Sequence, residues 1–373
     1  MVSKACVVGI YQRKLEEIAR LGVDLTVVVP PGWRDERGWL PLERTHTEGY
    51  RLLVTPVILN GSFHMHHYPR LKHILAEVQP DLIHVDEEPY NLATWRAARQ
   101  AWRAARQARR TGRAGTGPRL VFFSWQNLRR DYPPPFRWME RFVYRHAAYA
   151  IAGNQAAAQV LRAKGYAGPL SVLPQFGVDP ALYGTSRPPA PDAPFVIGYV
   201  GRLVPEKGVA DLLHAASGLK GQWRIRLFGA GPQRDALSAT ARSLGIAERV
   251  AFEGQVPSPD VPAHLSELHA LVLPSHTRPN WMEQFGRVLI EGMASWVPVV
   301  GSDSGEIPNV IGDAGLVFAQ GDVEGLRRHL QALIDDRALW TDLARRGRER
   351  VLARFTQAQI AAQTVRVYRE ALA

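Results

Sequence analysis

Two acidic and two basic residues in the second half of the chain have the types and the spacing needed to bind a phosphorylated sugar. Arg202 and Lys207 lie in GRLVPEKG, directly after the apolar run FVIGYV, and Glu283 and Glu291 bracket QFG at the start of a helical pattern. A helix start presents unpaired N–H groups and the positive end of a dipole to a phosphate. The two carboxylates could then accept hydrogen bonds from sugar hydroxyls beside a diphosphate and from a ribose on its far side.

Glycine follows several apolar runs in this half. Gly201 begins GRLVPEKG, Gly229 and Gly231 lie in RIRLFGAGP, and Gly254 lies in VAFEGQV. A glycine at the carboxyl end of a strand lets the backbone approach a ligand, although a single one is common in any α/β protein. A solvated turn is the alternative interpretation of GRLVPEKG. Its two cations favour a phosphate site at the sheet edge where doubly wound proteins bind nucleotides.

The elements that would position these residues alternate along the chain. Its 373 residues suffice for two domains of roughly 150 to 200 residues. Apolar β-branched runs alternate with helical patterns, which predicts parallel sheets covered by helices. We expect a Rossmann-like domain over 1–183, a Pro-rich linker over 184–194, a second Rossmann-like domain over 195–350, and a C-terminal helix within 351–373 that could pack on either domain. The expected strands are 5–8, 24–29, 51–57, 82–85, 120–123, 149–151, 171–173, 195–200, 224–228, 250–252, 270–273 and 297–301.

These motifs together resemble the family-4 glycosyltransferases, which belong to the glycosyl transferases group 1. The resemblance is carried by GRLVPEKG, FGAGP, VAFEGQV and EQFGRVLIEGM, in that order, and extends from about Phe195 to Asp336. It implies an α/β protein of the GT-B fold, with two Rossmann-like domains facing each other across a cleft. It also implies a retaining enzyme that moves a hexose-type sugar from a nucleotide diphosphate sugar to a glycan or lipid-linked acceptor, in polysaccharide or glycoconjugate synthesis, without a metal or other cofactor.

The resemblance assigns a role to each matching position. Arg202 and Lys207 would hold the donor diphosphate, and together with Glu283 they form the expected catalytic set. The remaining donor-site positions are the glycines Gly201, Gly229 and Gly231, the pair Gln255 and Val256 flanking the base, Gln284, the backbone of Phe285 and Gly286 beside Glu283 at the sugar and its phosphate, and Glu291 at the ribose.

The chain departs from the family pattern at three places. A glycine-rich loop commonly follows the first strand, whereas GIYQRKLEEIAR offers only Gly9, with Arg13 and Lys14 as possible substitutes for the loop. A histidine is common after the strand that here ends VFF, where this chain has Trp125, Gln126 and Asn127. Asn309 stands where a glutamate is frequent, which we regard as minor.

The acceptor side is less defined. Glu87 and Glu88 follow the expected strand 82–85 and, with Trp125, Gln126 and Asn127, are candidates for it; alternatively they form the acidic first turn of the next helix. The segment NGSFHMHHYP contains His64, His66 and His67. Adjacent side chains on an extended segment diverge and no acid or Cys completes a ligand set. We therefore expect no metal, and interpret the segment as a loop shaping the acceptor pocket or an uncommitted polar loop.

The net charge of +11 comes from the first half, where residues 1–190 hold 26 Lys and Arg against 15 Asp and Glu, while the rest hold 20 of each. The basic run WRAARQAWRAARQARR, residues 95–110, separates into a Trp and Ala half and an Arg and Gln half at roughly 100° per residue. This pattern predicts a helix that covers a sheet with its charged side in solvent. Contact with an anionic membrane is a second hypothesis; nucleic acid is not expected, since no aromatic platform accompanies the charge.

Localisation follows from simple observations. The single Cys6 excludes an intramolecular disulfide, and MVSKACVVGI lacks the long apolar run of a signal peptide. We expect a cytoplasmic protein, with peripheral contact at the inner face of the membrane as a further hypothesis.

Two other functions compete with sugar transfer. A nucleotide-sugar epimerase on the same scaffold would need acid and base groups and no acceptor. A non-enzymatic protein that binds anionic surfaces would use the basic first half and leave the second half's acidic and basic residues without a role. The bracketing of QFG by Glu283 and Glu291 favours transfer.

Overall fold

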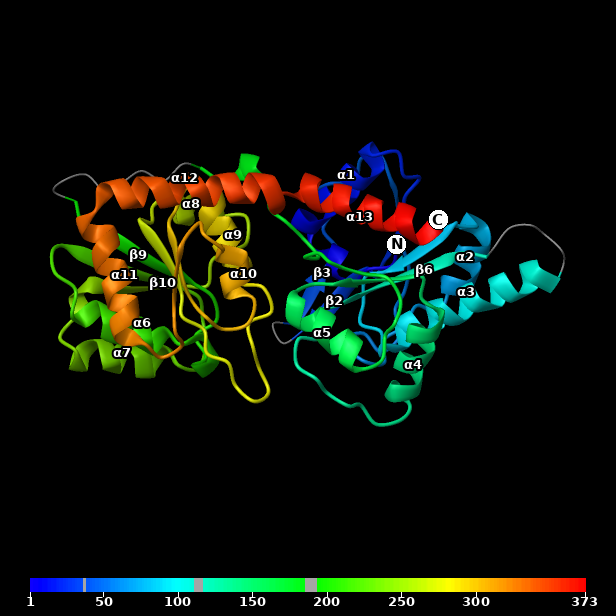
Figure 1. Cartoon of the computed structure of the whole chain (residues 1–373), viewed down its shortest axis with the longest axis horizontal. Helices are drawn as coiled ribbons and strands as arrows, with labels where there is room; N and C mark the ends of the chain where they lie inside the picture. Colours follow the sequence, from blue (N-terminus) through cyan, green and yellow to red (C-terminus); the bar gives the residue numbers. More distant parts are fainter. Residues whose placement is uncertain (36–37, 111–116, 185–192) are drawn as a thin grey trace. The chain divides into compact units, whose positions relative to one another are not determined.

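The computed structural model describes residues 1–35, 38–110, 117–184 and 193–373 (Figure 1). The chain forms two compact units, the first made of Met1–Gly177 and Gln357–Ala373 and the second of Val178–Thr356. Most of the linker expected at 184–194 lies outside the described residues. Residues 178–183, which the sequence assigned to the first domain, belong to the second unit because Val178 bridges Thr356 and its N–H donates to the carbonyl of Phe355 at 2.9 Å.

The first unit contains a parallel sheet. Val2 lies between Val28 and Val85 and connects β1 and β4 on one side to the order β5-β6-β7-β8 on the other. A separate antiparallel hairpin, β2 with β3, was not predicted. The strands are β1 (Thr26–Val29), β2 (Gly32–Asp35), β3 (Gly38–Pro41), β4 (Arg51–Val54), β5 (Leu82–Val85), β6 (Arg119–Ser124), β7 (Tyr149–Ala152) and β8 (Leu170–Val172).

The prediction of a strand at 5–8 is wrong. Residues Ala5–Val7 form the 3₁₀ helix η1 and Gly9–Gln12 form η2. The sheet position is already filled by Val2, whose N–H donates to the carbonyl of His84 at 2.8 Å. The chain leaves the sheet after Ser3, and Cys6 is buried against Leu15 and Ile18 instead. A short apolar run does not by itself distinguish a strand from another buried segment.

Helices cover both faces of this sheet. One core contains residues of α2 (Leu71–Val78), α3 (Leu92–Arg110), α4 (Phe136–His146) and α5 (Gln155–Ala163). On the other face, α1 (Arg13–Arg20) and the C-terminal helix α13 (Gln357–Leu372) share one smaller core, and α13 packs against β6 and β7 in a second. The C-terminal helix thus packs on the first unit, one of the two positions that the sequence left open.

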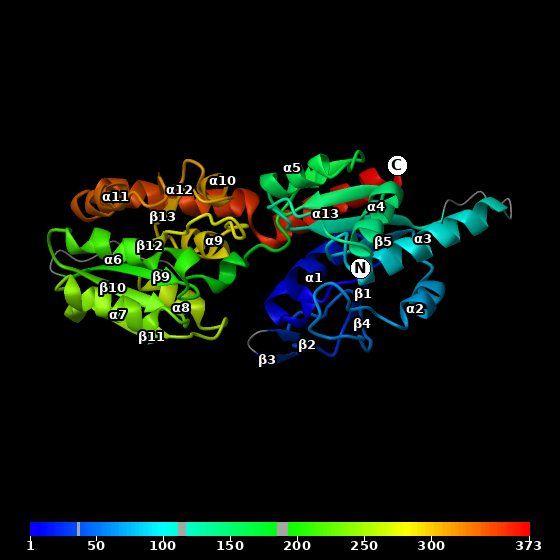
Figure 2. The same ribbon diagram turned by 90° about the horizontal axis from the view of Figure 1, so that it is seen from below.

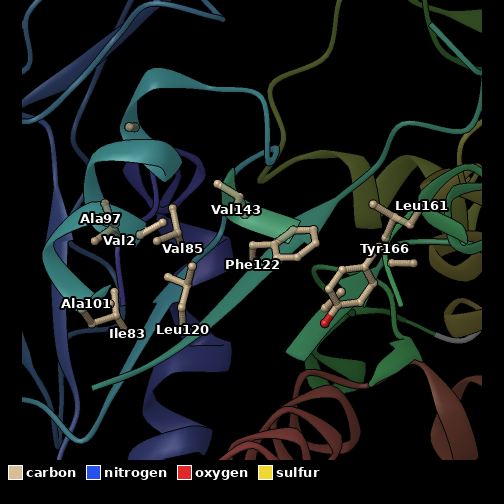
Figure 3. Packing of buried hydrophobic residues seen from close by; sticks show 14 of the residues in the cluster. Val2, Ile83, Val85, Ala97, Ala101, Leu120, Phe122, Val143, Leu161 and Tyr166 are labelled. Carbon is tan, nitrogen blue, oxygen red and sulfur yellow. The ribbon is translucent and has the colours of Figure 1, made fainter. Parts of the chain in front are cut away.

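Helix α3 is the Arg-rich helix. Ala97, Ala98 and Ala101 are buried, and Figure 3 shows Ala97 and Ala101 beside Val2, Val85 and Ile83. Ala104, which the periodicity placed on the inner side, is exposed. The inward alanine side is therefore present in the first half of α3 and does not extend to Ala104. Over the ranges that the structure describes, no helix is both long and apolar enough to span a lipid bilayer.

The second unit contains a six-stranded parallel sheet in the order β11-β10-β9-β12-β13-β14, of which β9 to β13 are labelled in Figure 2. The chain runs outward from β9 to β11, then returns to β12 on the other side of β9, so the strand order reverses between β9 and β12. Ligands of such sheets bind at the carboxyl ends of the strands at this reversal. The strands are β9 (Phe195–Val200), β10 (Trp223–Phe228), β11 (Val250–Gly254), β12 (Ala270–Leu273), β13 (Val299–Ser302) and the unpredicted β14 (Leu316–Phe318).

Helices α6 (Val209–Ser217) and α11 (Val323–Asp335) pack together in this unit, as do α9 (Arg287–Ala294) and α12 (Arg337–Arg354). The other helical segments are η3 (Pro180–Leu182), η4 (Pro205–Lys207), α7 (Arg234–Ser243), η5 (Ala247–Arg249), α8 (Val261–Ser266) and α10 (Ile307–Ile311).

Candidate functional site

Lys207 and Glu283 meet at the reversal of strand order in the second unit. Lys207 follows β9 and Glu283 follows β12, and the Lys207 Nζ atom lies 2.6 Å from Oε2 of Glu283. The buried hydroxyl of Ser275 donates to the same oxygen at 3.0 Å. The ammonium group also lies 4.9 Å from the centre of the Trp281 ring. Two residues that the sequence singled out are therefore brought together where a doubly wound sheet binds its ligand.

Gly208 makes this close approach possible. Its φ of +64° lies in the left-handed region, and a Cβ atom there would lie 2.0 Å from the carbonyl oxygen of Pro274. Glycine alone avoids both penalties. The loop after β9 can consequently lie directly against the loop after β12, which places Lys207 beside Glu283.

The loops after β9 and β10 also pack backbone to backbone. A Cβ at Gly229 would lie 1.8 Å from the carbonyl oxygen of Gly201, so this contact requires the glycine at 229. The N–H of Leu203 donates to the carbonyl of Ala230 at 2.9 Å. Arg202, between these contacts, projects outward: its side chain is 58% exposed and lies 3.8 Å from Glu206. The structure thus places Arg202 on the loop after β9, the same loop that carries Lys207.

Glu283 leads into helix α9. Gly286 is the N-cap residue of α9 with a φ of +75°, and Phe285 before it is buried against Phe355, with ring centres 5.8 Å apart. The side chain of Gln284 is exposed. The backbone of Glu283 accepts from the N–H of Glu306 at 3.2 Å, which fixes the loop. The start of α9 therefore follows Glu283 closely in the chain, and it offers N–H groups to an anion.

Glu291 lies in the second turn of α9. Its Oε1 atom is 2.9 Å from Nε of Arg287, and Tyr183 donates a hydrogen bond to the same carboxylate. Burial raises the pKa of Glu291, an effect that Arg287 opposes. Tyr183 could not be found from the sequence motifs, because it lies in a segment assigned to the other domain. Gln255 and Val256 follow the edge strand β11; Gln255 is exposed and Val256 half-buried.

In the first unit, two adjacent carboxylates have different environments. Glu87 forms an ion pair with Lys4, and its Oε1 lies 3.7 Å from Nε2 of His66. Burial acts to raise the pKa of Glu87, but Lys4 and His66 outweigh it and lower the pKa to about 2. Lys4 was not singled out from the sequence.

Glu88 follows the same strand end. It accepts hydrogen bonds from the Ser124 hydroxyl and the Trp125 N–H, each at 2.7 Å. Burial nevertheless raises its pKa to about 7. Gln126 donates to the carbonyl of Leu128 at 3.2 Å, and the side chain of Asn127 is buried. Glu88, Trp125, Gln126 and Asn127 therefore come from the carboxyl ends of the paired strands β5 and β6.

The first-strand loop is not a phosphate site of the expected kind. Lys14 is buried and donates to the carbonyl of Gln175 at 2.8 Å, and Arg13 pairs with Glu16 at 2.8 Å. The Gly9 N–H donates to the carboxylate of Glu43, so an acid occupies the amide that a phosphate would use. Both side chains that the sequence suggests as substitutes for a glycine-rich loop thus have partners within the first unit.

The histidine segment packs largely against aromatic residues. The ring of His64 lies 5.4 Å from that of Tyr90 and 5.1 Å from that of Phe136. The ring of His66 lies edge-on to Trp33 at 4.9 Å. Within the described ranges, no group of three or more His, Cys, Asp and Glu side chains is arranged to hold a metal ion.

Comparisons with known proteins find glycosyltransferase matches in both halves of the chain. Residues 186–350 match the model of the glycosyl transferases group 1, and residues 10–175 match that of the glycosyl transferase 4-like domain. The chain is 27% identical over 354 residues to the lipopolysaccharide core biosynthesis glycosyltransferase LpsE of Rhizobium meliloti, covering 92% of this chain and 89% of the relative. It is 32% identical over 197 residues to glycogen synthase of Mycobacterium tuberculosis, covering 52% of this chain but only 46% of that enzyme.

Among solved structures, Anabaena Alr3699/HepE in complex with UDP-glucose is similar, with a TM-score of 0.65, 20% identity, and coverage of 99% of this chain and 98% of that one. An identity this low shows the fold alone, which is GT-B. The two family models together match nearly the whole chain, which therefore belongs to the family-4 type of GT-B glycosyltransferases.

Proposed function

We propose that this protein is a retaining glycosyltransferase that moves a hexose-type sugar from a nucleotide diphosphate sugar to a glycan or lipid-linked acceptor, in polysaccharide or glycoconjugate synthesis. The observation that carries the proposal is the Lys207–Glu283 pair at the reversal of strand order, beside the N-terminus of α9. A diphosphate needs cations and N–H donors, and a sugar needs a carboxylate to accept from its hydroxyls. Both are supplied by adjacent loops of one unit.

The chemistry follows from where charge develops. Breaking the bond between the sugar carbon and the diphosphate oxygen leaves negative charge on the diphosphate and positive charge on the sugar. Lys207, Arg202 and the N–H groups at Gly286 would stabilise the first, and Glu283 would hold the sugar. The acceptor hydroxyl attacks the sugar carbon from the face of the leaving group, and a diphosphate oxygen takes its proton. No carboxylate nucleophile is needed, and the cations of the chain replace a metal.

Relatives support a nucleotide-sugar donor. The solved HepE structure is a complex with UDP-glucose, and a relative of Mycolicibacterium smegmatis, 32% identical over 152 residues, is named a GDP-mannose-dependent phosphatidylinositol monomannoside mannosyltransferase. The acceptor side is assigned to the first unit, with Glu87, Glu88, Trp125, Gln126 and Asn127 as candidates. Because the positive charge comes from this half of the chain, we assign it an acidic glycan or an acceptor at the inner face of the membrane.

A transfer assay tests the proposal. A thermal-shift screen with UDP, GDP and ADP in EDTA identifies the base, since a ligand at 100 times its Kd stabilises by about 2.7 kcal/mol. The matching nucleotide sugars are then incubated with and without glycan acceptors. We expect release of the nucleotide diphosphate that increases with acceptor, and a product with retained anomeric configuration. Conversion of the donor to its epimer without an acceptor would support the epimerase instead, and inversion would overturn the retaining mechanism.

A vesicle assay tests the membrane contact. Sedimentation with vesicles of phosphatidylcholine alone and with added phosphatidylglycerol should show more bound protein on the anionic vesicles, and less at high salt. Equal binding to both vesicle types would remove this part of the proposal.

A further inference from the structure

Glu291 is held by two residues outside the Lys207–Glu283 pair and its loops. Arg287, one turn earlier on α9, lies 2.9 Å from one carboxylate oxygen. Tyr183, from the segment before β9, donates its hydroxyl to the same carboxylate and accepts from Arg287. Arg287 and Tyr183 thus both lie beside the Glu291 carboxylate. Tyr183 is itself buried, with 7% of its surface exposed.

The segment that carries Tyr183 and the helix that carries Glu291 are held by the same arginine, Arg348. The Asp179 side chain accepts from the N–H of Ala181 at 3.1 Å and begins the turn η3. Arg348 of α12 donates to the carbonyl of Pro180 at 3.3 Å and also to the carbonyl of Ala294 at the end of α9. One arginine thus joins the Tyr183 segment to the helix of Glu291, so the position of the tyrosine relative to the carboxylate is set by the unit itself.

This arrangement leaves part of the carboxylate available for a ligand. The Glu291 side chain keeps 14% of its surface exposed. A carboxylate has about four lone-pair positions; Tyr183 donates to one of them, and Arg287 lies beside Oε1 as an ion pair. The remaining positions suit a vicinal diol, whose two hydroxyls donate side by side. A carboxylate already held in one orientation also loses less side-chain freedom when it binds.

We propose that Tyr183 is a positioning residue that holds Glu291 for the 2′ and 3′ hydroxyls of the donor ribose. The proposal rests on the donor site of the proposed function. It adds a residue from outside the strand-and-helix motifs, on a segment that belongs to the second unit. Tyr183 acts through Glu291 and sets the preference for a ribonucleotide over a deoxyribonucleotide.

The test compares nucleotides with and without ribose hydroxyls. Calorimetry on the full chain measures Kd for UDP and 2′,3′-dideoxy-UDP, or for the GDP or ADP pair if the screen selects that base. The wild type should bind the ribonucleotide about 10- to 100-fold more tightly, as expected for hydrogen bonds to a charged group. Tyr183→Phe should bring this ratio below about 5-fold by weakening the ribonucleotide while leaving the dideoxy form unchanged.

Controls separate the possible failures. Tyr166→Phe removes a hydroxyl that donates to the carbonyl of Pro169 in the first unit, and should keep the wild-type ratio. Arg287→Gln should lower the ratio as Tyr183→Phe does, which protects the test if one variant folds poorly. A wild-type ratio in folded Tyr183→Phe overturns the role of Tyr183 and leaves the donor site intact. If the wild type binds none of the three nucleotides, the proposed function fails and this inference with it.

Discussion

The Lys207 ammonium group lies 2.6 Å from the carboxylate of Glu283, although the two residues are 76 positions apart in the chain. Each follows one of two neighbouring strands, β9 and β12, at the point where the strand order reverses. The motifs around these residues assign each a role by resemblance; the topology supplies the physical reason why they meet. This pairing and the loop at Gly208 have measurable consequences for activity and stability, as do the carboxylates Glu87 and Glu88 of the first unit.

Replacing Glu283 should remove transfer without unfolding the protein. In Glu283→Gln the side chain keeps its size and loses its charge, so it no longer pairs with Lys207 or accepts strongly from a sugar. We expect turnover to fall at least about 100-fold, the scale for losing one stabilising group in an active site. Glu324→Gln, which removes an exposed carboxylate on α11, serves as the charge-matched control. Wild-type turnover in Glu283→Gln would reject the site.

Replacing Lys207 should cost both stability and donor affinity. In Lys207→Met the carboxylate of Glu283, which is 8% exposed, loses its cation. We expect the free energy of unfolding to fall by about 2 to 3 kcal/mol, less than for a fully buried pair because both side chains keep some exposure. Urea unfolding measures this loss. In the double variant Lys207→Met with Glu283→Gln, much of the stability should return; simple addition of the two single losses would contradict the pairing.

Gly208→Ala should disturb the site through the backbone. The added Cβ would lie 2.0 Å from the carbonyl of Pro274 in a left-handed conformation. We expect a loss of more than about 2 kcal/mol, from the φ penalty together with the displaced loop, and weaker nucleotide binding. Gly245→Ala is the matched control: its φ of +70° is similar but nothing lies within 4 Å, so it should cost only about 1 kcal/mol. Equal losses in the two variants would show that the loop contact is unimportant.

Glu88 should make stability fall as the pH rises. Its pKa is raised from 4.5 to about 7, so between these values the folded state binds a proton that the unfolded state releases. Folding stability therefore declines from about pH 4.5 to 7. Relative to Glu88→Gln, the wild type should lose up to about 3 kcal/mol across this window, measured by urea unfolding at several pH values. Parallel curves for the two proteins would contradict a raised pKa.

Glu87 should show the opposite sign. Its pKa of about 2 lies below the ordinary value of 4.5, because Lys4 and His66 outweigh the effect of burial. Its contribution to stability is present above pH 4.5 and is lost as the pH falls toward 2. Glu87→Gln should remove this acid-dependent loss while leaving the decline caused by Glu88, again measured by urea unfolding across the pH range. An unchanged acid-dependent loss in Glu87→Gln would contradict a lowered pKa.

The sequence was most informative about features that depend on residues close together in the chain, such as turns after strands and the starts of helices. Gly201, Lys207 and Gly286 could be placed on loops and at a helix start from the order of apolar runs and glycines, and the structure has them there. The reversal between β9 and β12 could not be read from the chain, because pairing between distant strands leaves no local pattern. Neither could Ser275, whose role depends on that pairing.

Other errors came from contacts made over long distances in sequence. The apolar run around Cys6 predicts a strand, but Val2 already occupies that place in the sheet. Lys14 is a candidate phosphate ligand in the sequence, but in the structure it donates to the carbonyl of Gln175, 161 positions away. The Pro-rich composition after Tyr183 predicts a domain boundary at 184 and so places this residue in the first domain, whereas the structure has it in the second unit. In each case tertiary packing overrode a plausible local pattern.

The most direct test of the donor site is the affinity of the full chain for UDP-glucose, GDP-mannose and ADP-glucose, measured by calorimetry in EDTA for the wild type and for Lys207→Met. We predict that one of these donors binds the wild type without metal and that Lys207→Met weakens it at least about 10-fold, the loss expected for a charged hydrogen bond. Binding that requires metal, or equal affinity in the two proteins, would contradict the claim that the loops after β9 and β12 form the donor site.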